Sequence, residues 1–226
     1  MARSALALLA ILSCSTSVFA QTATTGAKPE KWDVNAPPGM TTHKVPIRVD
    51  EGSWMNVDVA PDGRTIAFDL LGDIYVMPIE GGTPTRIADG LAYEHQPRFS
   101  PDGKRIAFVS DRGGGDNIWL MNRDGSDKRQ LSKEEFRLLN QPRWSPDGQF
   151  IVAKKHFTTG RSLGTGEVWM YHVSGGSGVP LVKKPNDRHQ KELGEPVFAP
   201  DGKGIYYTRN VTPGPIFESA QDSNSD

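Results

Sequence analysis

Six charged or imidazole side chains are the candidates for binding chemistry, because all of them fall in segments predicted to be loops. They are Glu94, His95, His156, Arg161, Arg188 and His189. Carboxylate, imidazole and guanidinium groups gathered at the mouth of a channel would bind a polar ligand or a partner surface. No two of them have a spacing that is diagnostic of a catalytic site, so solvated loop residues are the simpler interpretation.

Serine-hydrolase chemistry is suggested by one motif and opposed by its context. Gly160-Arg161-Ser162-Leu163-Gly164 matches the G-x-S-x-G pattern of the nucleophile elbow. The elbow requires a helix directly after the serine, because that turn strains and exposes the hydroxyl. A strand is predicted at Val168 instead, so a glycine-rich loop is the preferred interpretation.

Phosphate and metal sites have little support in the sequence. Segment 111–116 lacks the Gly-Lys-Ser/Thr ending of a phosphate loop, and segment 122–127 lacks the final glutamate of a calcium loop. The histidines form neither an H-x-H nor an H-E-x-x-H pair. We therefore expect no cofactor, no metal and no catalytic residue in this chain.

A turn motif that occurs four times defines the scaffold that must position these loops. Pro-Asp-Gly stands at 61–63, 101–103, 146–148 and 200–202, so the prolines are 40, 45 and 54 residues apart. Proline presets φ for the first corner, aspartate hydrogen-bonds the turn backbone, and glycine accepts φ > 0. An apolar run follows each copy, which predicts strand, tight turn, strand. A repeat of this length is typical of a β-propeller.

Each of the first three repeats carries the signals of four short strands, which together make one propeller blade. The blades are expected to begin near residues 50, 92, 134 and 190. Residues 44–49 are predicted as an edge strand that closes the last blade, and residues 134–139 as one helical turn that Ser132 opens, with Glu135 in the capping-box position. The Pro-Asp-Gly turns should share one face, and the longer loops, where function is expected, should share the other.

The fourth repeat lacks its third and fourth strands, because only a polar, Pro-containing segment follows Arg209. A propeller needs at least four complete blades to close. The sequence therefore predicts an all-β fold, a β-propeller of four-stranded blades with about three and a half blades present and the ring incomplete. The chain is expected to be a fragment of a longer protein, or one of two chains that combine.

The first 42 residues are expected to lie outside the propeller, which spans 43–226. Residues 1–20 combine Arg3, an apolar run and Val18-Phe19-Ala20, which is typical of a signal peptide cleaved after Ala20. Lipidation at Cys14 is the alternative. Residues 21–42 are expected to be a flexible leader. We expect an exported protein, periplasmic or secreted, with no transmembrane segment after cleavage.

The charge pattern bears on the possible partners. The formal net charge is -1, from 26 basic and 27 acidic residues that are mixed along the chain without a basic run. Nucleic acids and anionic membrane surfaces attract clustered positive charge. We therefore expect no nucleic-acid partner.

The repeats resemble the TolB and tricorn-protease type of propeller, in which Ser-Pro-Asp-Gly precedes an Ile-Ala-Phe strand. The second repeat carries the resemblance best, from Phe99-Ser100-Pro101-Asp102-Gly103 to Ile118-Trp119, and the whole covers about residues 50–209. Segments 51–56, 68–75 and 160–167 further resemble the N-terminal propeller of large exported amidohydrolases. In that family a metal-dependent hydrolase barrel follows the propeller.

The narrower resemblance implies a non-catalytic propeller segment that positions or gates substrate access to an active site elsewhere. Any divalent metal would belong to a downstream domain, and the partners would be that catalytic domain and the C-terminal blades. None of the family's catalytic residues has a counterpart here. A TolB-like periplasmic module that binds envelope proteins is the alternative, and the propeller of a serine peptidase is a third.

Overall fold

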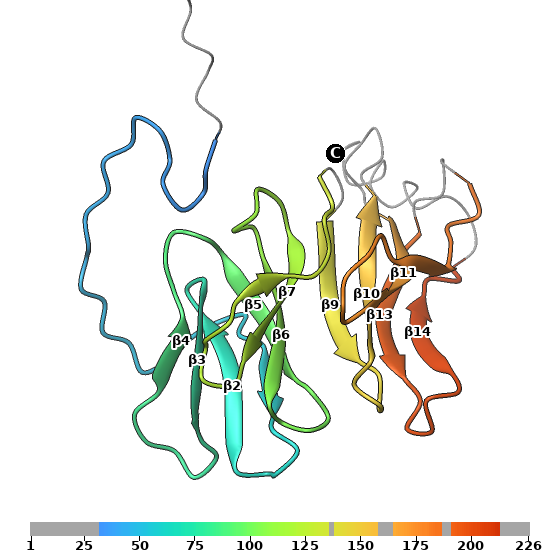
Figure 1. The fold of residues 1–226 in the computed structure, drawn as a ribbon, viewed down its shortest axis with the longest axis horizontal. Coiled ribbons are helices and arrows are strands. Elements are labelled where there is room, and N and C mark those ends of the chain that lie inside the picture. The colour runs from blue at the N-terminus through green and yellow to red at the C-terminus, as the bar shows by residue number, and fades with distance from the viewer. Residues whose placement is uncertain (1–31, 136–137, 158–164, 187–190, 213–226) are drawn as a thin grey trace, which may run out of the picture. The chain divides into compact units, whose positions relative to one another are not determined.

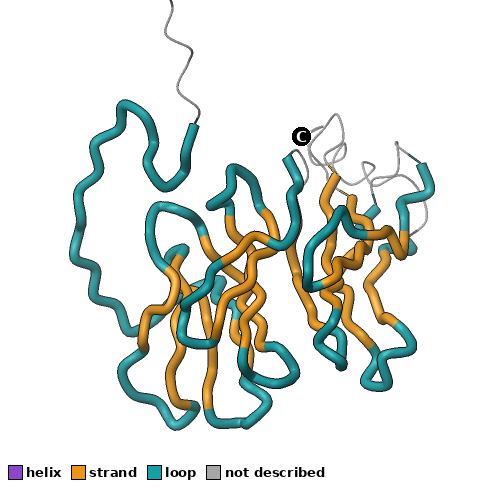
Figure 2. The backbone as a smooth tube through the Cα atoms, in the orientation of Figure 1, coloured by secondary structure: helices purple, strands orange, loops and turns teal. Residues whose placement is uncertain are grey.

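The structure, a computed structural model, describes residues 32–135, 138–157, 165–186 and 191–212, and their regular secondary structure is entirely β-strand (Figure 1 and Figure 2). The signal-peptide prediction for residues 1–20 lies outside these ranges. Within them, no helix is long and apolar enough to cross a membrane.

The strands form three four-stranded antiparallel sheets and one two-stranded sheet, each connected in sequence order. The first blade contains β1 (Val57–Val59), β2 (Thr65–Leu70), β3 (Asp73–Pro78) and β4 (Thr85–Ala88). The second blade contains β5 (Glu94–Phe99), β6 (Arg105–Ser110), β7 (Asn117–Asn122) and β8 (Arg129–Gln130). The third blade contains β9 (Leu138–Trp144), β10 (Phe150–Phe157), β11 (Thr165–His172) and β12 (Val179–Val182). The two-stranded sheet contains β13 (Leu193–Phe198) and β14 (Ile205–Arg209). This arrangement confirms the predicted all-β fold, an incomplete β-propeller of four-stranded blades.

The Pro-Asp-Gly turns join the first and second strands of every blade. In the second blade the N–H of Gly103 donates to the Ser100 carbonyl at 2.8 Å, and the Ser100 hydroxyl donates to Asp102 Oδ1 at 2.5 Å. A side chain placed at Gly103 would contact Pro61 of the preceding turn, and Gly148 and Gly202 stand in the same relation to Pro101 and Pro146. Successive turns therefore pack side by side on one face, as expected.

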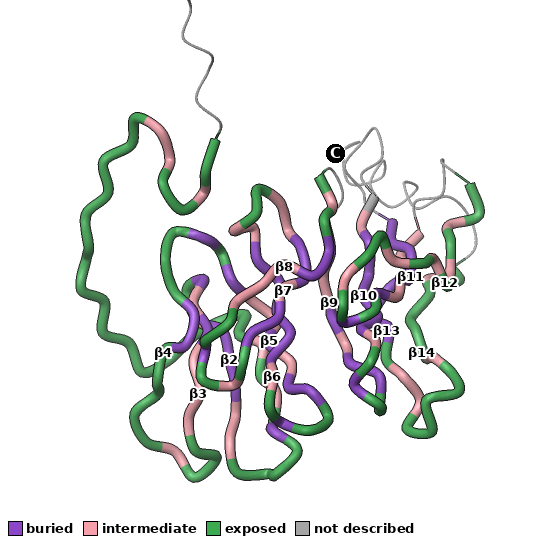
Figure 3. The backbone as a smooth tube through the Cα atoms, in the orientation of Figure 1, coloured by how far each residue is buried: buried purple, intermediate pink, exposed green. Residues whose placement is uncertain are grey.

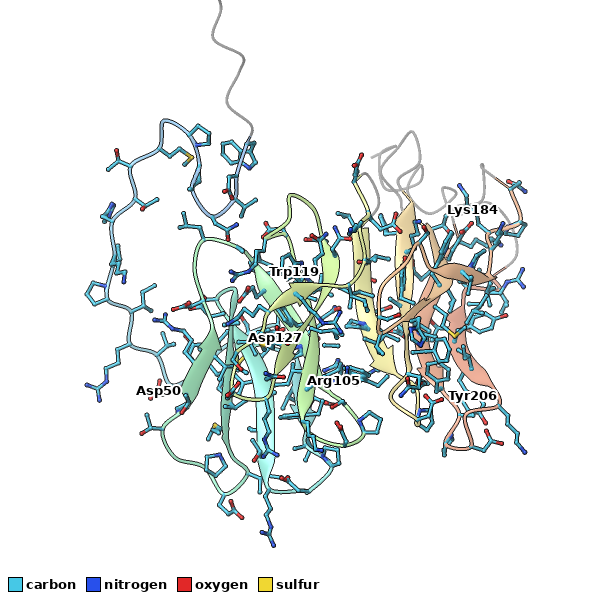
Figure 4. The ribbon with its side chains drawn as sticks, viewed as in Figure 1. Asp50, Arg105, Trp119, Asp127, Lys184 and Tyr206 are labelled. Atoms are coloured by element: carbon cyan, nitrogen blue, oxygen red, sulfur yellow. The ribbon has the colours of Figure 1, made fainter. Side chains whose placement is uncertain are left out.

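Two apolar cores hold neighbouring blades together. One joins the first and second blades around Ile74 and Phe108, and the other joins the second and third around Ile118 and Tyr171. In Figure 3 most residues of β6 and β7 in the second blade are buried, whereas those of β14 are mostly exposed. Arg105 on β6, labelled in Figure 4, forms a cation–π interaction with the third blade, because its guanidinium lies 5.0 Å from the centroid of the Trp144 ring.

Two local predictions were wrong. Residues 44–49 form no strand and are exposed, because no described strand pairs with them and a strand needs a partner to satisfy its backbone. The helical turn predicted at 134–139 is not formed by the described residues of that segment, since 134–135 are irregular and 138–139 belong to β9; residues 136–137 lie outside the described ranges. The Ser132 hydroxyl donates to Asn117 Oδ1 at 2.8 Å and accepts from the Ile118 N–H at 2.9 Å, so it is not available as a helix cap.

Candidate functional site

The first strands of the second, third and fourth blades each contain a β-bulge at one equivalent position, five residues before the proline of the turn. Gln96, Gln141 and Glu195 occupy this position with φ of 55°, 56° and 50°. In each blade two residues of the first strand stand opposite one residue of the second. Such a bulge bends the strand and redirects its side chains. Asn56 stands at the same distance from Pro61 in the first blade.

A relay of hydrogen bonds connects these positions from blade to blade. Asp69 accepts from the backbone N–H of Asn56 at 2.8 Å and from that of Gln96 at 2.7 Å. Gln96 Oε1 accepts from the N–H of Gln141 at 2.5 Å, and Gln141 Oε1 accepts from the N–H of Glu195 at 2.8 Å. Each left-handed residue thus has its amide satisfied by the preceding blade, which offsets the cost of its conformation.

A cavity of about 410 Å³ opens among these first strands. Its lining comes from the first-strand segments of all four blades and consists of Asn56, Gln96, Arg98, Gln141, Arg143, Glu195, Pro196 and Val197. Successive first strands β1, β5, β9 and β13 contact one another. In a propeller the first strands surround the central channel, so this cavity is the candidate site.

Two guanidinium groups dominate the electrostatics of the cavity. Burial lowers the pKa of Arg98, and the neighbouring charge of Arg143 lowers it further. Arg98 Nη1 donates to the carbonyls of Val57 at 3.1 Å and Pro97 at 2.9 Å, but its Nε is buried without a partner among the described residues. The Asp58 carboxylate lies near both arginines and accepts from the Phe99 N–H at 2.7 Å; burial nevertheless raises its pKa.

Glu94 and His95, both candidates from the sequence, are neighbours on β5. Glu94 is fully buried and pairs with Arg112, whose Nε donates to Oε1 at 2.9 Å. Burial raises the pKa of Glu94 against the opposing effect of Arg112, and Oε2 has no partner within the described ranges. Burial lowers the pKa of His95, although Asp116, Asp69 and Asp111 oppose it. Glu94 and Arg112 therefore form a structural ion pair. His95 is affected by the charge of Asp69, which belongs to the relay.

His156 belongs to a different group of residues, at the end of β10. Burial lowers its pKa, the charge of Lys154 lowers it further, and Glu192 opposes both. Lys154 is itself buried and pairs with Glu192. The remaining sequence candidates, Arg161, Arg188 and His189, lie outside the described residues, as does Ser162. In the parts of the chain that are described, no group of three or more His, Cys, Asp or Glu residues could hold a metal ion.

The cavity residues were not among the candidates from sequence, although a signal for them exists. The tripeptide Gln-Pro-Arg occurs twice, at 96–98 and at 141–143, each time directly before an aromatic residue and a Ser-Pro-Asp-Gly turn. Repetition at a fixed distance from a turn marks one structural position. The sequence alone did not show that this position bulges into the channel.

Comparisons with known proteins agree with this architecture. The TolB beta propeller domain family matches residues 41–219. An uncharacterized peptidase of Bacillus subtilis, YuxL, is 26% identical over 190 residues, which cover 68% of this chain and 29% of that protein. A putative tricorn-like protease C-terminal subunit of Sulfurisphaera tokodaii is 25% identical over 154 residues, which cover 68% of this chain and 16% of that protein. The chain thus spans less than a third of either relative.

The structural comparison points to the same fold. The structure of a putative TolB from Agrobacterium tumefaciens superposes with a TM-score of 0.55 and 21% identity, over 68% of this chain and 52% of that one. The family match covers well over half of the sequence and coincides with the repeated blades. The chain belongs to the TolB beta propeller domain family.

Proposed function

We propose that this chain is the non-catalytic propeller segment of a larger exported hydrolase, and that its channel positions or gates the substrate on the way to an active site elsewhere. The observation that carries the proposal is the cavity among the first strands, which is lined by two arginines, three amide side chains and Glu195. Polar groups in this number suit an extended polar substrate better than an apolar one.

The class of hydrolase is the finer part of the proposal. Matches to much longer proteins named as a peptidase and as a tricorn-like protease support hydrolysis of amide bonds. The resemblance of segments 51–56, 68–75 and 160–167 to amidohydrolase propellers supports a metal-dependent barrel, with its divalent metal in that downstream domain. Export rests on the signal-like residues 1–20.

Determining the coding sequence beyond Asp226 tests the proposal. We expect further Pro-Asp-Gly repeats that complete the ring, followed by a hydrolase domain, and an H-x-H segment in that domain would identify the amidohydrolase class. A stop codon directly after Asp226, with no hydrolase encoded downstream, would contradict the proposal.

A second function, a TolB-like module that binds envelope proteins, is favoured by the family match itself. A pull-down from an envelope extract separates the two. Retention of a defined envelope protein by the folded chain, together with a coding sequence that has no hydrolase domain, would favour the interaction module. The hydrolase segment would be favoured if the 226-residue chain retained no partner and a longer protein that contains it hydrolysed amides.

A further inference from the structure

Several side-chain hydrogen-bond donors of the cavity among the first strands have no acceptor within the described residues. Gln96 and Gln141 each use Oε1 as the acceptor in the relay, and neither Nε2 donates a hydrogen bond within the described residues. Arg143 likewise donates none there, and Arg98 Nε is buried without a partner. Two guanidinium groups and two amide groups therefore face one cavity with donors to spare. Only Arg98 Nε is a buried unpaired donor among them, which is costly. The donors of Gln96, Gln141 and Arg143 belong to half-buried residues, and a ligand with acceptor oxygens would give them partners.

No carboxylate of the protein already fills this role among the residues that the structure describes. Asp69 is used by three donors, the N–H and Nδ2 of Asn56 and the N–H of Gln96. Asp58 accepts from Phe99 N and forms no ion pair with either arginine in the described chain. Glu195 lines the cavity but is exposed, and it too is unpaired there. The arginines thus lack the bidentate partner that their geometry suits.

We propose that this cavity binds a carboxylate group of a peptide, with Arg143 and Arg98 as its cationic ligands and the side-chain amides of Gln96 and Gln141 as further donors. This inference rests on the proposed function insofar as the peptide would be the substrate that the channel positions. A volume of about 410 Å³ accommodates a small ligand or the end of a longer one. Pro196 and Val197 add an apolar wall beside the polar groups, which suits a small aliphatic side chain next to the carboxylate.

The local charge favours a carboxylate over a phosphate. The two arginines of the cavity are formally balanced by the Glu195 carboxylate, which lines it, and by Asp58, which interacts with both arginines, so these four groups carry no net formal charge. A singly charged carboxylate therefore meets less repulsion from these acidic groups than a phosphate dianion does. The carboxylate could come from a peptide C-terminus or from a glutamate side chain, and the two sources are separable by experiment.

Isothermal titration of the 226-residue chain with defined peptides tests the inference. The probes are N-acetyl-trialanine with a free C-terminus, its C-terminal amide, and N-acetyl-Ala-Glu-Ala amide. We expect the free acid to bind at least about tenfold more tightly than its amide, as the loss of a charged hydrogen bond implies. Binding of the glutamate peptide as tight as that of the free acid would extend the site to acidic side chains. Equal binding of the acid and its amide would overturn the proposal.

Variants assign the binding to the arginines. Arg143→Gln removes a charge without removing a hydrogen bond in the described structure, so the fold should persist while affinity for the free acid falls about tenfold or more. Arg143→Lys keeps the charge but not the planar guanidinium with its paired donors, so its affinity for the free acid should fall less than that of Arg143→Gln. Arg64→Gln, at the exposed first turn, is the matched control and should bind like the wild type. Unchanged binding by Arg143→Gln, or displacement of the peptide by equimolar inorganic phosphate, would contradict the assignment.

The measurement requires no hydrolysis, so its failure is distinguishable from failure of the proposed function. Selective binding of the free acid by a chain whose gene encodes no hydrolase would refute the hydrolase segment and leave the carboxylate site in place. A hydrolase whose propeller does not discriminate the acid from the amide would refute the site alone.

Discussion

The side chain of Gln96 accepts a hydrogen bond from the backbone N–H of Gln141, 2.5 Å away in the next blade. Gln141 has φ of 56°, so a residue of one blade satisfies the amide of a left-handed residue in its neighbour. The Gln141 side chain likewise accepts a hydrogen bond from the N–H of Glu195, so each blade holds the bulged residue in the first strand of the next blade. The relay therefore connects blade packing to the geometry of the candidate site.

Removal of the Gln96 side chain should break one connection of the relay. Gln96→Ala leaves the half-buried N–H of Gln141 without its acceptor, and we expect a loss of about 1–3 kcal/mol in the free energy of unfolding. Urea denaturation measures this change. Gln149→Ala, at an exposed glutamine whose side chain makes no hydrogen bond in the described structure, should change stability by less than about 0.5 kcal/mol. Equal effects of the two substitutions would show that the relay contributes nothing.

Close approach between the first two blades makes Gly125 sensitive to substitution. A Cβ at Gly125 would stand 2.2 Å from the carbonyl oxygen of Ile87 on β4. Gly81 has a similar φ, 98° against 85°, but open space around it. Gly125→Ala should therefore destabilise the chain by at least about 1 kcal/mol more than Gly81→Ala, as expected of overpacking. Equal melting temperatures for the two variants would contradict the contact.

The serine of the Pro-Asp-Gly turn should stabilise the hairpin that it begins. The buried Ser100 hydroxyl accepts from the Arg105 N–H at 2.9 Å and donates to Asp102, and this bond lowers the pKa of Asp102. Ser100→Ala should cost about 1 kcal/mol, measured by urea denaturation. The first blade has Ala60 at the same position, so Ala60→Ser is the matched reverse and should leave stability unchanged or raise it. A stabilising Ser100→Ala would refute this role.

Burial of His95 predicts a dependence of stability on pH. Burial lowers its pKa below the ordinary value of about 6.5, against the opposing charges of Asp116, Asp69 and Asp111. As the pH falls, His95 therefore binds a proton at a higher pH in the unfolded chain than in the folded chain. The free energy of unfolding thus decreases as the pH falls through about 6.5 toward the folded-state pKa. His95→Asn should flatten unfolding free energy between pH 7 and about 5.5 relative to the wild type. His43→Asn, in the exposed segment before the first blade, is the control and should keep the wild-type slope.

Local chemistry explains what the sequence predicted. The Pro-Asp-Gly turn is determined by its own residues, so the hairpin at each of the four copies and the four-stranded blades could be anticipated. Segment 44–49 has strand-like alternation but forms no strand, because pairing depends on a partner that the described residues do not supply. The fold was therefore predictable wherever it depended on local turn chemistry.

Most of the candidate site was not predictable, because it depends on residues that only packing brings together. Gln96 and Gln141 are 45 residues apart, and their contact requires both the bulge and the docking of two blades. Glu94 looked like a loop carboxylate, yet its pairing with Arg112 in a buried strand makes it structural. The repeated Gln-Pro-Arg tripeptide was visible in the sequence, but the direction in which it faces was not.

Obstruction of the channel in the proposed longer hydrolase tests the central claim most directly. Val197→Trp would place an indole in the cavity, and Val179→Trp would place one on the outer strand β12, at a valine of similar exposure, 49% against 44%. The measurement is kcat/KM for hydrolysis of a long peptide and of a single-residue amide. We predict that Val197→Trp lowers kcat/KM for the long peptide at least about tenfold, which corresponds to about 1.4 kcal/mol in transition-state stabilisation, and does not change kcat/KM for the small amide. Val179→Trp should have the wild-type kcat/KM for both substrates. Equal hydrolysis of the long peptide by the two variants would contradict the role of the channel.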